Sequence, residues 1–286
     1  MIEVIDRIPT YPGRVKMTPV EGQSNTYDMV RADQPTEVGT PLNRALFESI
    51  RSDVTALQHN VSDLVTSHAQ KTTVGTLVPG TEFVLYEDGI RVPFIKLAGE
   101  YNSTGRNLVI RKNIYKMDTL VASGSAPTYM NSKTDLWLND EVGGYVAKLD
   151  SLTKAALAEV PILLYVGDAV TTTATLNRKA FLLSATEYGI NDTSTFFPEG
   201  TAVGYFNSTT RRVSQFNGAA EPHWMRSRNR SVTGSTGYIG NNGAFSTYGP
   251  SGGVYGIRPA LTLPADFEVD LSVTNTGNVM ATAEVI

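Results

Sequence analysis

Apolar residues between positions 47 and 64 recur at alternating intervals of three and four, and the positions between them are mostly polar. This spacing puts the apolar side chains on one narrow stripe of an α-helix, as in a coiled coil. The stripe consists of Phe47, Ile50, Val54, Leu57, Val61 and Leu64. Thr40 and Pro41 suit a helix start, because the hydroxyl can cap free amides and proline loses no hydrogen bond at the first helical position. We predict a coiled-coil stalk helix over residues 41–70 and oligomerisation through this stripe; the alternative is one amphipathic helix packed on its own domain.

The first 40 residues show little periodicity of either kind. They contain Pro9, Pro12, Pro19 and Pro35 together with scattered charges. Proline restricts the backbone and interrupts regular hydrogen bonding. We therefore predict an extended arm over residues 1–40 that becomes ordered on a partner.

From about residue 75 the pattern changes to short β-prone runs separated by turn residues. Residues 82–94 read as a hairpin, because Glu87, Asp88 and Gly89 form a turn between two apolar runs. Residues 132–160 have apolar positions at helical spacing, with Gly143 and Gly144 as a break. Further strands are expected at residues 108–115, 180–184, 203–206, 213–216 and 256–261. The mixture predicts an α+β domain over residues 75–264, followed by a C-terminal extension or closing hairpin over residues 265–286.

Composition excludes several classes of function. The 24 Lys and Arg and 28 Asp and Glu residues give a net charge of -4 at pH 7, which makes a general nucleic-acid binder unfavourable. The absence of cysteine removes disulfides, thiolate metal sites and cysteine nucleophiles. There is no apolar run long enough to span a membrane, and residues 1–7 lack the character of a signal peptide. We expect a chain that is made and kept in the cytoplasm until another process releases it.

Two parts of the sequence resemble known families. Residues 27–43, from Tyr27-Asp28-Met29-Val30 to Pro41-Leu42-Asn43, resemble segments near the N-termini of phage and prophage tail-fibre and baseplate-appendage proteins. In those proteins an arm that attaches to the particle leads into a short helical stalk. The resemblance implies that residues 1–40 anchor the chain to other tail or baseplate proteins.

The second resemblance spans about residues 75–264. Four blocks in order are similar to the signature of an uncharacterised domain family found in phage and surface proteins, which is itself similar to C-type-lectin-like and formylglycine-generating-enzyme-like folds. The blocks lie at residues 129–139, 180–188, 223–227 and 256–261. The resemblance implies a C-type-lectin-like domain, of the kind that also serves as a display scaffold in targets of diversity-generating retroelements. Oxidase chemistry like that of the formylglycine-generating relatives is not expected, because it depends on cysteines.

The segment 231–256 fits such a binding face. None of its 26 residues is charged, and 20 of them are Gly, Ser, Thr, Asn or Tyr. Small residues give an adaptable loop, and tyrosines supply large amphipathic contact area at low entropic cost. The receptor contacts predicted in this segment are Tyr238, Asn241, Asn242, Tyr248 and Tyr255. A plain surface loop is the alternative.

Arginines gather near this segment and give residues 201–264 a local charge of +5. Guanidinium groups suit anionic phosphates or carboxylated sugars. We expect Arg226 and Arg258, which lie in signature blocks, to bond buried backbone carbonyls instead. Arg228 and Arg230 are predicted receptor contacts, and Trp224 is included with them although a core position is the alternative.

Catalytic and metal chemistry find little support. His59, His68 and His223 have no paired spacing, and Glu221-Pro222-His223 is a poor match to a calcium loop because imidazole is the wrong donor. We expect no metal, cofactor or catalytic residue. The serious enzymatic alternative is glycan cleavage, which needs two nearby carboxylates. Its candidates are Glu187, Asp192 and Glu199.

These observations together favour a viral protein of the virion: a tail fibre, or receptor-binding protein, that serves adhesion and host attachment. The expected partners are a host-surface receptor, either glycan or protein, and other tail proteins. Heptad chemistry leaves dimer and trimer open, and the resemblance implies a homotrimer. No nucleic acid and no membrane insertion are expected. The alternatives are a surface-polymer depolymerase and a structural baseplate component without receptor binding.

Overall fold

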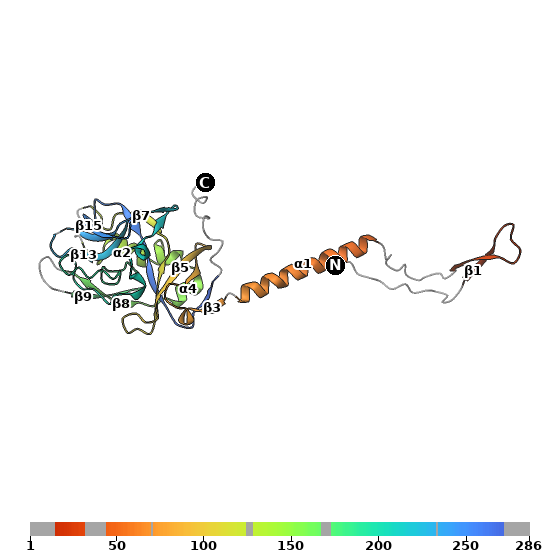
Figure 1. Ribbon diagram of the computed structural model, residues 1–286, viewed down its shortest axis with the longest axis horizontal. Helices are drawn as coiled ribbons and strands as arrows, with labels where there is room; N and C mark the ends of the chain where they lie inside the picture. Colours follow the sequence, from red (N-terminus) through yellow and green to blue (C-terminus); the bar gives the residue numbers. More distant parts are fainter. Residues whose placement is uncertain are drawn as a thin grey trace. The chain divides into compact units, whose positions relative to one another are not determined.

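The computed structural model divides the chain into two compact units, Met1–His68 and Ala69–Ile286. Each unit is described by itself (Figure 1). The residues that the structure describes are 15–31, 44–69, 71–123, 128–166, 173–232 and 234–271.

The first unit contains a two-stranded antiparallel hairpin of β1 (Val15–Pro19) and β2 (Tyr27–Arg31), in which Met17 lies opposite Met29. The extended arm predicted over residues 1–40 therefore includes a regular β-hairpin at residues 15–31, which the sequence analysis did not predict. Each strand has only five residues, which is too short for the alternation of apolar and polar positions to be recognised among the prolines and charges. The rest of the predicted arm lies outside the described residues.

The first unit also contains all but the last residue of the long helix α1 (Arg44–Ala69), which confirms the helix predicted over residues 41–70. Its predicted start at Thr40 and Pro41 lies outside the described residues. Five side chains of the apolar stripe are between 46% and 61% exposed, and that of Leu64 is not described. The exposed members are Phe47, Ile50, Val54, Leu57 and Val61.

The second unit is built on a seven-stranded sheet with the order β10-β17-β6-β5-β4-β18-β3, paired antiparallel throughout. Its central strands are rich in Val, Ile, Leu and Phe, which suit a pleated surface buried by neighbours. Phe83, Phe94 and Ile110 belong to the main core. The strands are β3 (Lys71–Thr73), β4 (Glu82–Glu87), β5 (Ile90–Ala98), β6 (Asn107–Arg111), β10 (Ala180–Phe181), β17 (Ala260–Leu263) and β18 (Glu268–Asp270).

A second sheet has five strands in the order β15-β14-β13-β16-β7. Within the described part of the chain, only its β13–β16 pair is parallel. The strands are β7 (Lys116–Asp118), β13 (His223–Arg228), β14 (Thr236–Ile239), β15 (Phe245–Tyr248) and β16 (Tyr255–Ile257).

Short helices connect the sheets, and the helical prediction for residues 132–160 holds up to Ala156. Ser132 caps α2 (Lys133–Asn139) by accepting a hydrogen bond from the Asp135 amide, and Asp150 caps α4 (Ser151–Ala156) in the same way. Gly143 and Gly144 separate α2 from α3 (Tyr145–Lys148), as predicted. The other elements are η1 (Val74–Thr76), η2 (Gly204–Phe206), α5 (Thr209–Arg212), β8 (Val160–Tyr165), β9 (Thr173–Arg178), β11 (Gln215–Phe216) and β12 (Ala219–Ala220).

The α+β class is confirmed, and several elements are corrected. The predicted strand at residues 203–206 is the 3-10 helix η2. The segment 231–256 is not a plain loop, because it contains the β14–β15 hairpin. The block 256–261 divides at Arg258-Pro259 into strands of two different sheets, since proline offers no amide for pairing.

The limits predicted for the domain, residues 75 and 264, are too narrow. Strand β18 lies in the predicted C-terminal extension, yet it pairs with both β3 and β4 in the seven-stranded sheet. The closing hairpin expected near the C-terminus lies outside the described residues. No helix within the described ranges is long and apolar enough to cross a membrane.

Candidate functional site

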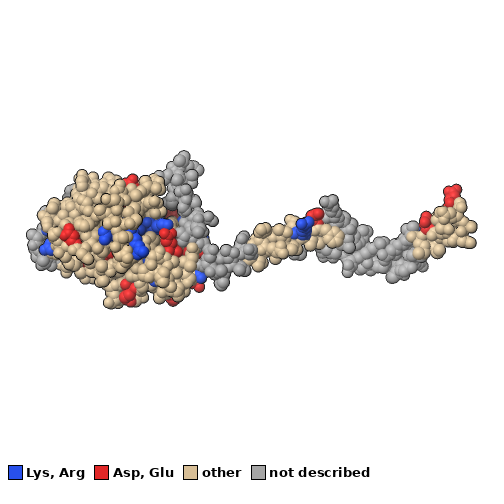
Figure 2. Space-filling view, viewed as in Figure 1, with Lys and Arg blue, Asp and Glu red and all other residues tan. Residues whose placement is uncertain are grey.

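Three of the predicted contact residues, Tyr238, Tyr248 and Tyr255, lie together on the five-stranded sheet and form what we call the tyrosine cluster. The ring centroids of Tyr238 and Tyr255 are 4.4 Å apart, and those of Tyr248 and Tyr255 are 5.9 Å apart. They come from β14, β15 and β16, so strand pairing brings them to one place. In Figure 2 the area around β15 is drawn almost without charged side chains.

Trp224 forms the floor of the tyrosine cluster. Its ring lies 4.7 Å from that of Tyr255 and 6.4 Å from that of Tyr238, and its Nε1 donates a hydrogen bond to the Asp118 carbonyl at 3.0 Å. Trp224 is 0% exposed, whereas Tyr248 is 50% exposed. The prediction of Trp224 as a receptor contact is therefore corrected to its core alternative, because the tyrosines cover it.

Two glycines allow this packing. A Cβ atom on Gly253 would lie 2.9 Å from the Tyr248 ring and 3.1 Å from Trp224. One on Gly237 would lie 2.5 Å from the Met225 methyl group. All three distances are shorter than a normal carbon contact, so glycine at these two positions permits a close approach of backbone to side chains.

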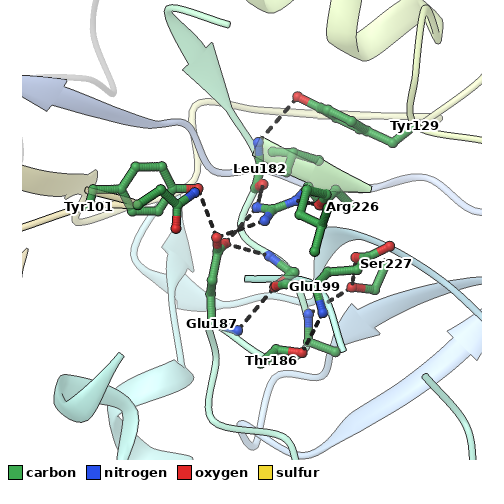
Figure 3. Close-up of polar contacts among 12 residues, drawn as sticks. Tyr101, Tyr129, Leu182, Thr186, Glu187, Glu199, Arg226 and Ser227 are labelled. Carbon is green, nitrogen blue, oxygen red and sulfur yellow. Dashed lines mark hydrogen bonds and ion pairs between the residues drawn. The ribbon is translucent and has the colours of Figure 1, made fainter. Parts of the chain in front are cut away.

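Below the surface, the domain holds a buried polar network around Glu187 and Arg226 (Figure 3). The guanidinium donates to both carboxylate oxygens, Nη1 to Oε2 at 2.5 Å and Nη2 to Oε1 at 2.7 Å. The Tyr101 hydroxyl donates to Oε1 at 2.8 Å, and the Ser184 amide donates to Oε2 at 2.9 Å. Both charged side chains are fully buried, so each depends on the other for compensation.

Glu199 is the second acid of this network. It accepts hydrogen bonds from the Tyr165 amide at 2.7 Å and from the Ser227 hydroxyl. Burial raises the pKa of Glu199 to about 7, although Arg226 and these hydrogen bonds act to lower it. The folded protein therefore holds this proton more tightly than the unfolded chain does.

We expect a pH dependence of stability that comes from Glu199. The contribution of this proton is fully present below the ordinary carboxyl pKa, near 4.5, and is lost as the pH rises to about 7. Thermal unfolding at several pH values should show a fall in melting temperature over this range, and Glu199→Gln should flatten it. Glu268→Gln, at an exposed acid of β18, is the control and should leave the slope unchanged. An equal slope in the wild-type chain and in Glu199→Gln would contradict the prediction.

The three acids considered for glycan cleavage are not brought together on the described surface. Glu187 and Glu199 are buried in the network, with 0% and 1% exposure. Asp192 accepts hydrogen bonds from Ser194 and Thr195 of its own turn. Cleavage needs two carboxylates on either side of an accessible bond, and these three do not supply them.

The prediction for Arg226 and Arg258 is confirmed. Arg226 donates to the Leu182 carbonyl at 2.8 Å, and Arg258 donates to the Arg111 carbonyl at 2.9 Å. The pairing of Arg226 with Glu187 was not foreseen, because 39 residues of chain separate the two positions.

Comparison with known families identifies a domain family that covers much of the second unit. Residues 104–265 match a domain family described only as a domain of unknown function, DUF6273. The match covers more than half of the chain. The chain belongs to this family. Comparison with curated proteins and with solved structures gave no match.

The tyrosine cluster lies within the DUF6273 region, as does the buried network apart from Tyr101. The seven-stranded sheet extends further, because β3, β4, β5 and β18 lie outside the matched residues. The folded unit is therefore wider than the DUF6273 match.

Of the other predicted receptor contacts, one is buried and three are exposed. Arg228 is buried at 5% exposure, so its prediction as a receptor contact is corrected: it lies at the end of β13, opposite Thr236. Arg230 is exposed, lies 4.2 Å from the centroid of the Phe197 ring and donates to the Thr193 carbonyl. Asn241 and Asn242 are exposed in the turn of the β14–β15 hairpin. One hairpin of the DUF6273 domain, β14–β15, therefore carries the two asparagines and two members of the tyrosine cluster, Tyr238 and Tyr248.

One residue beside the tyrosine cluster was missed by sequence analysis. Asp118 ends β7 and pairs in register with Tyr255. A three-residue strand carries no periodic signal, and only its pairing with β16 shows its position.

Metal binding finds no candidate in the part of the chain that the structure describes. There, no group of three His, Cys, Asp or Glu side chains is arranged to hold a metal ion.

Proposed function

We propose that this protein is a phage tail fibre, or receptor-binding protein, that attaches the virion to a receptor on the host surface. The observation that carries the proposal is the tyrosine cluster, in which three residues from three strands meet within a segment, residues 231–256, that contains no charged residue. Tyrosine rings are rigid and amphipathic, so they supply binding area at low entropic cost. Their arrangement on paired strands keeps them in place before binding.

The finer fold assignment belongs to this proposal. We take the second unit as a C-type-lectin-like domain, on the strength of the four ordered blocks at residues 129–261. Three of the four blocks meet in the buried network, through Tyr129, through Leu182 and Glu187, and through Arg226, which supports their common role in one scaffold. Such a scaffold would let residues 231–256 vary, as in diversity-generating retroelement targets, while the interior stays constant.

The stalk would add avidity. Several copies joined through α1 would display several tyrosine clusters, and linked weak sites gain apparent affinity by about 10² to 10⁴ without new contacts. Residues 1–40 would anchor the assembly to other tail or baseplate proteins.

Binding of the labelled full-length chain to a panel of bacterial strains tests the proposal. We expect at least one strain to bind it, and the triple variant Tyr238→Ala, Tyr248→Ala, Tyr255→Ala to lose about tenfold or more in apparent affinity, because loss of hot-spot tyrosines costs more than about 1 kcal/mol each. Tyr86→Ala, at an exposed tyrosine of β4 outside the cluster, is the control and should bind normally. Normal binding by the folded triple variant would contradict the proposal and favour a structural role.

A further inference from the structure

A polar group of three side chains borders the tyrosine cluster. Asp118 Oδ1 lies 2.6 Å from Lys133 Nζ, and Asp118 Oδ2 lies 3.0 Å from Lys116 Nζ. The Thr119 amide also donates to Asp118 Oδ1 at 2.8 Å. Lys116 is held from the other side as well, because its Nζ lies 3.8 Å from the centroid of the Trp137 ring. We call Lys116, Asp118 and Lys133 the Asp118 group.

The Asp118 group and the tyrosine cluster form one continuous surface. Asp118 and Tyr255 are direct partners in the antiparallel pair of β7 and β16. Residues directly opposite in such a pair project to the same face of the sheet. The hydrogen bond from Trp224 to the Asp118 carbonyl fixes the floor of the cluster to the same strand.

The side chains of the Asp118 group remain available to a ligand. All three are partly exposed, at 20% for Asp118, 31% for Lys116 and 48% for Lys133. Burial acts to raise the pKa of Asp118, but hydrogen bonds from Lys133 and Lys116 outweigh it and the pKa is lowered overall. Asp118 therefore stays ionised at neutral pH. Each ammonium group has three donors, so binding Asp118 leaves it able to donate to a further acceptor.

We propose that this combined surface binds a saccharide of the host-cell surface. The proposal rests on the proposed function and names its ligand class. A pyranose ring has a face of C–H bonds that packs on the negative face of an aromatic ring, and the half-exposed Tyr248 offers an aromatic ring for such a contact. Its vicinal hydroxyls both donate and accept, which matches a carboxylate flanked by two ammonium groups. Two lysines against one aspartate leave the group with a net positive charge, which favours neutral or acidic sugars.

The size of the surface also favours a saccharide over a protein. Only Tyr248 of the cluster is half exposed, while Tyr238 and Tyr255 are partly covered. A standard protein interface takes about 20–30 residues on each side. The tyrosine cluster and the Asp118 group together comprise six side chains, which suits one or two sugar rings.

Two treatments of a strain that binds the full-length chain distinguish the ligand classes. Periodate cleaves vicinal diols of glycans, and a protease removes surface proteins. We expect periodate to abolish binding and protease treatment to leave it unchanged. Loss of binding after protease but not after periodate would overturn the saccharide proposal and leave receptor binding intact. If no untreated strain bound the chain, the proposed function would fail and this inference with it.

A matched pair of variants tests the site itself. Asp118→Asn removes the carboxylate, and we expect it to lower apparent affinity for extracted surface polysaccharide about tenfold or more in calorimetry. Asp88→Asn removes a carboxylate that pairs with Lys148 in the turn between β4 and β5, and it should bind normally. Lys133→Gln is a second test of the site, and it should also lower the affinity. The Lys133 side chain is exposed, so its loss should not impair folding. Normal affinity of both Asp118→Asn and Lys133→Gln would overturn the assignment.

Discussion

Replacing Glu187 by glutamine is expected to lower the free energy of unfolding of the second unit by about 3–5 kcal/mol. The substitution leaves the Arg226 guanidinium buried without a countercharge, in a place where water does not reach it. The neutral amide also cannot accept two charge-assisted hydrogen bonds from the guanidinium. Chemical denaturation of the full-length chain, followed by Trp fluorescence, measures the loss because Trp224 lies in the same core.

An exposed ion pair gives the control for this prediction. Glu141 pairs with Lys179, and its side chain is 60% exposed. Glu141→Gln should change stability by less than about 1 kcal/mol, because exposed pairs contribute little. A second test is the double variant Glu187→Met, Arg226→Met, which removes both charges and should destabilise less than Glu187→Gln alone. Equal stability of Glu187→Gln and Glu141→Gln would show that the buried pair has no special role.

Local patterns predicted the elements that local interactions form. The apolar stripe identified α1, and the turn predicted at Glu87, Asp88 and Gly89 identified the β4–β5 hairpin, in which Glu87 is the last residue of β4. In both cases the signal lies within one continuous segment, since helix spacing and hairpin turns involve only near neighbours. The break at Gly143 and Gly144 was recognised for the same reason.

Strand pairing between distant segments could not be predicted in this way. The β14–β15 hairpin was taken for a loop because its glycines and small hydroxyls are typical of turns. Gly237 in fact lies within β14, where Met225 and Phe196 occupy the space that a side chain would need. That reason for glycine depends on residues brought near by the fold, so it cannot be read from the segment alone.

The candidate site shows the same division. The tyrosines were identified from composition, because an uncharged segment rich in Tyr and Gly has the chemistry of a binding surface. The sheet determines which aromatic and basic side chains face outward, and composition alone does not show this. For that reason Trp224 and Arg228 were predicted as surface contacts although they are buried. Asp118 escaped notice because it joins the tyrosines only through the pairing of β7 with β16.

Replacing Leu57 of α1 by aspartate is expected to dissociate an oligomer into single chains. Leu57 is 61% exposed and belongs to a stripe of five exposed apolar side chains on the described part of the helix. Fully burying one such side chain contributes about 1.5–3 kcal/mol. A seam between copies of α1 would bury the whole stripe, and a carboxylate at its centre would have to lose its hydration without a partner. Sedimentation equilibrium measures the change, from a trimer in the wild-type chain to a monomer in the variant.

Ser52→Asp is the matched control for Leu57→Asp, because it introduces the same charge on the face of α1 away from the stripe and should leave the oligomer intact. If the wild-type chain were itself monomeric, the stripe would need another occupant, and each tyrosine cluster would have to bind its receptor alone. If Leu57→Asp formed the same oligomer as the wild type, the copies would associate elsewhere. If Leu57→Asp is monomeric as expected, it also isolates the effect of avidity, because each chain keeps an unchanged tyrosine cluster. Its binding to cells should then weaken by about 10² or more. Its affinity for soluble polysaccharide should stay the same.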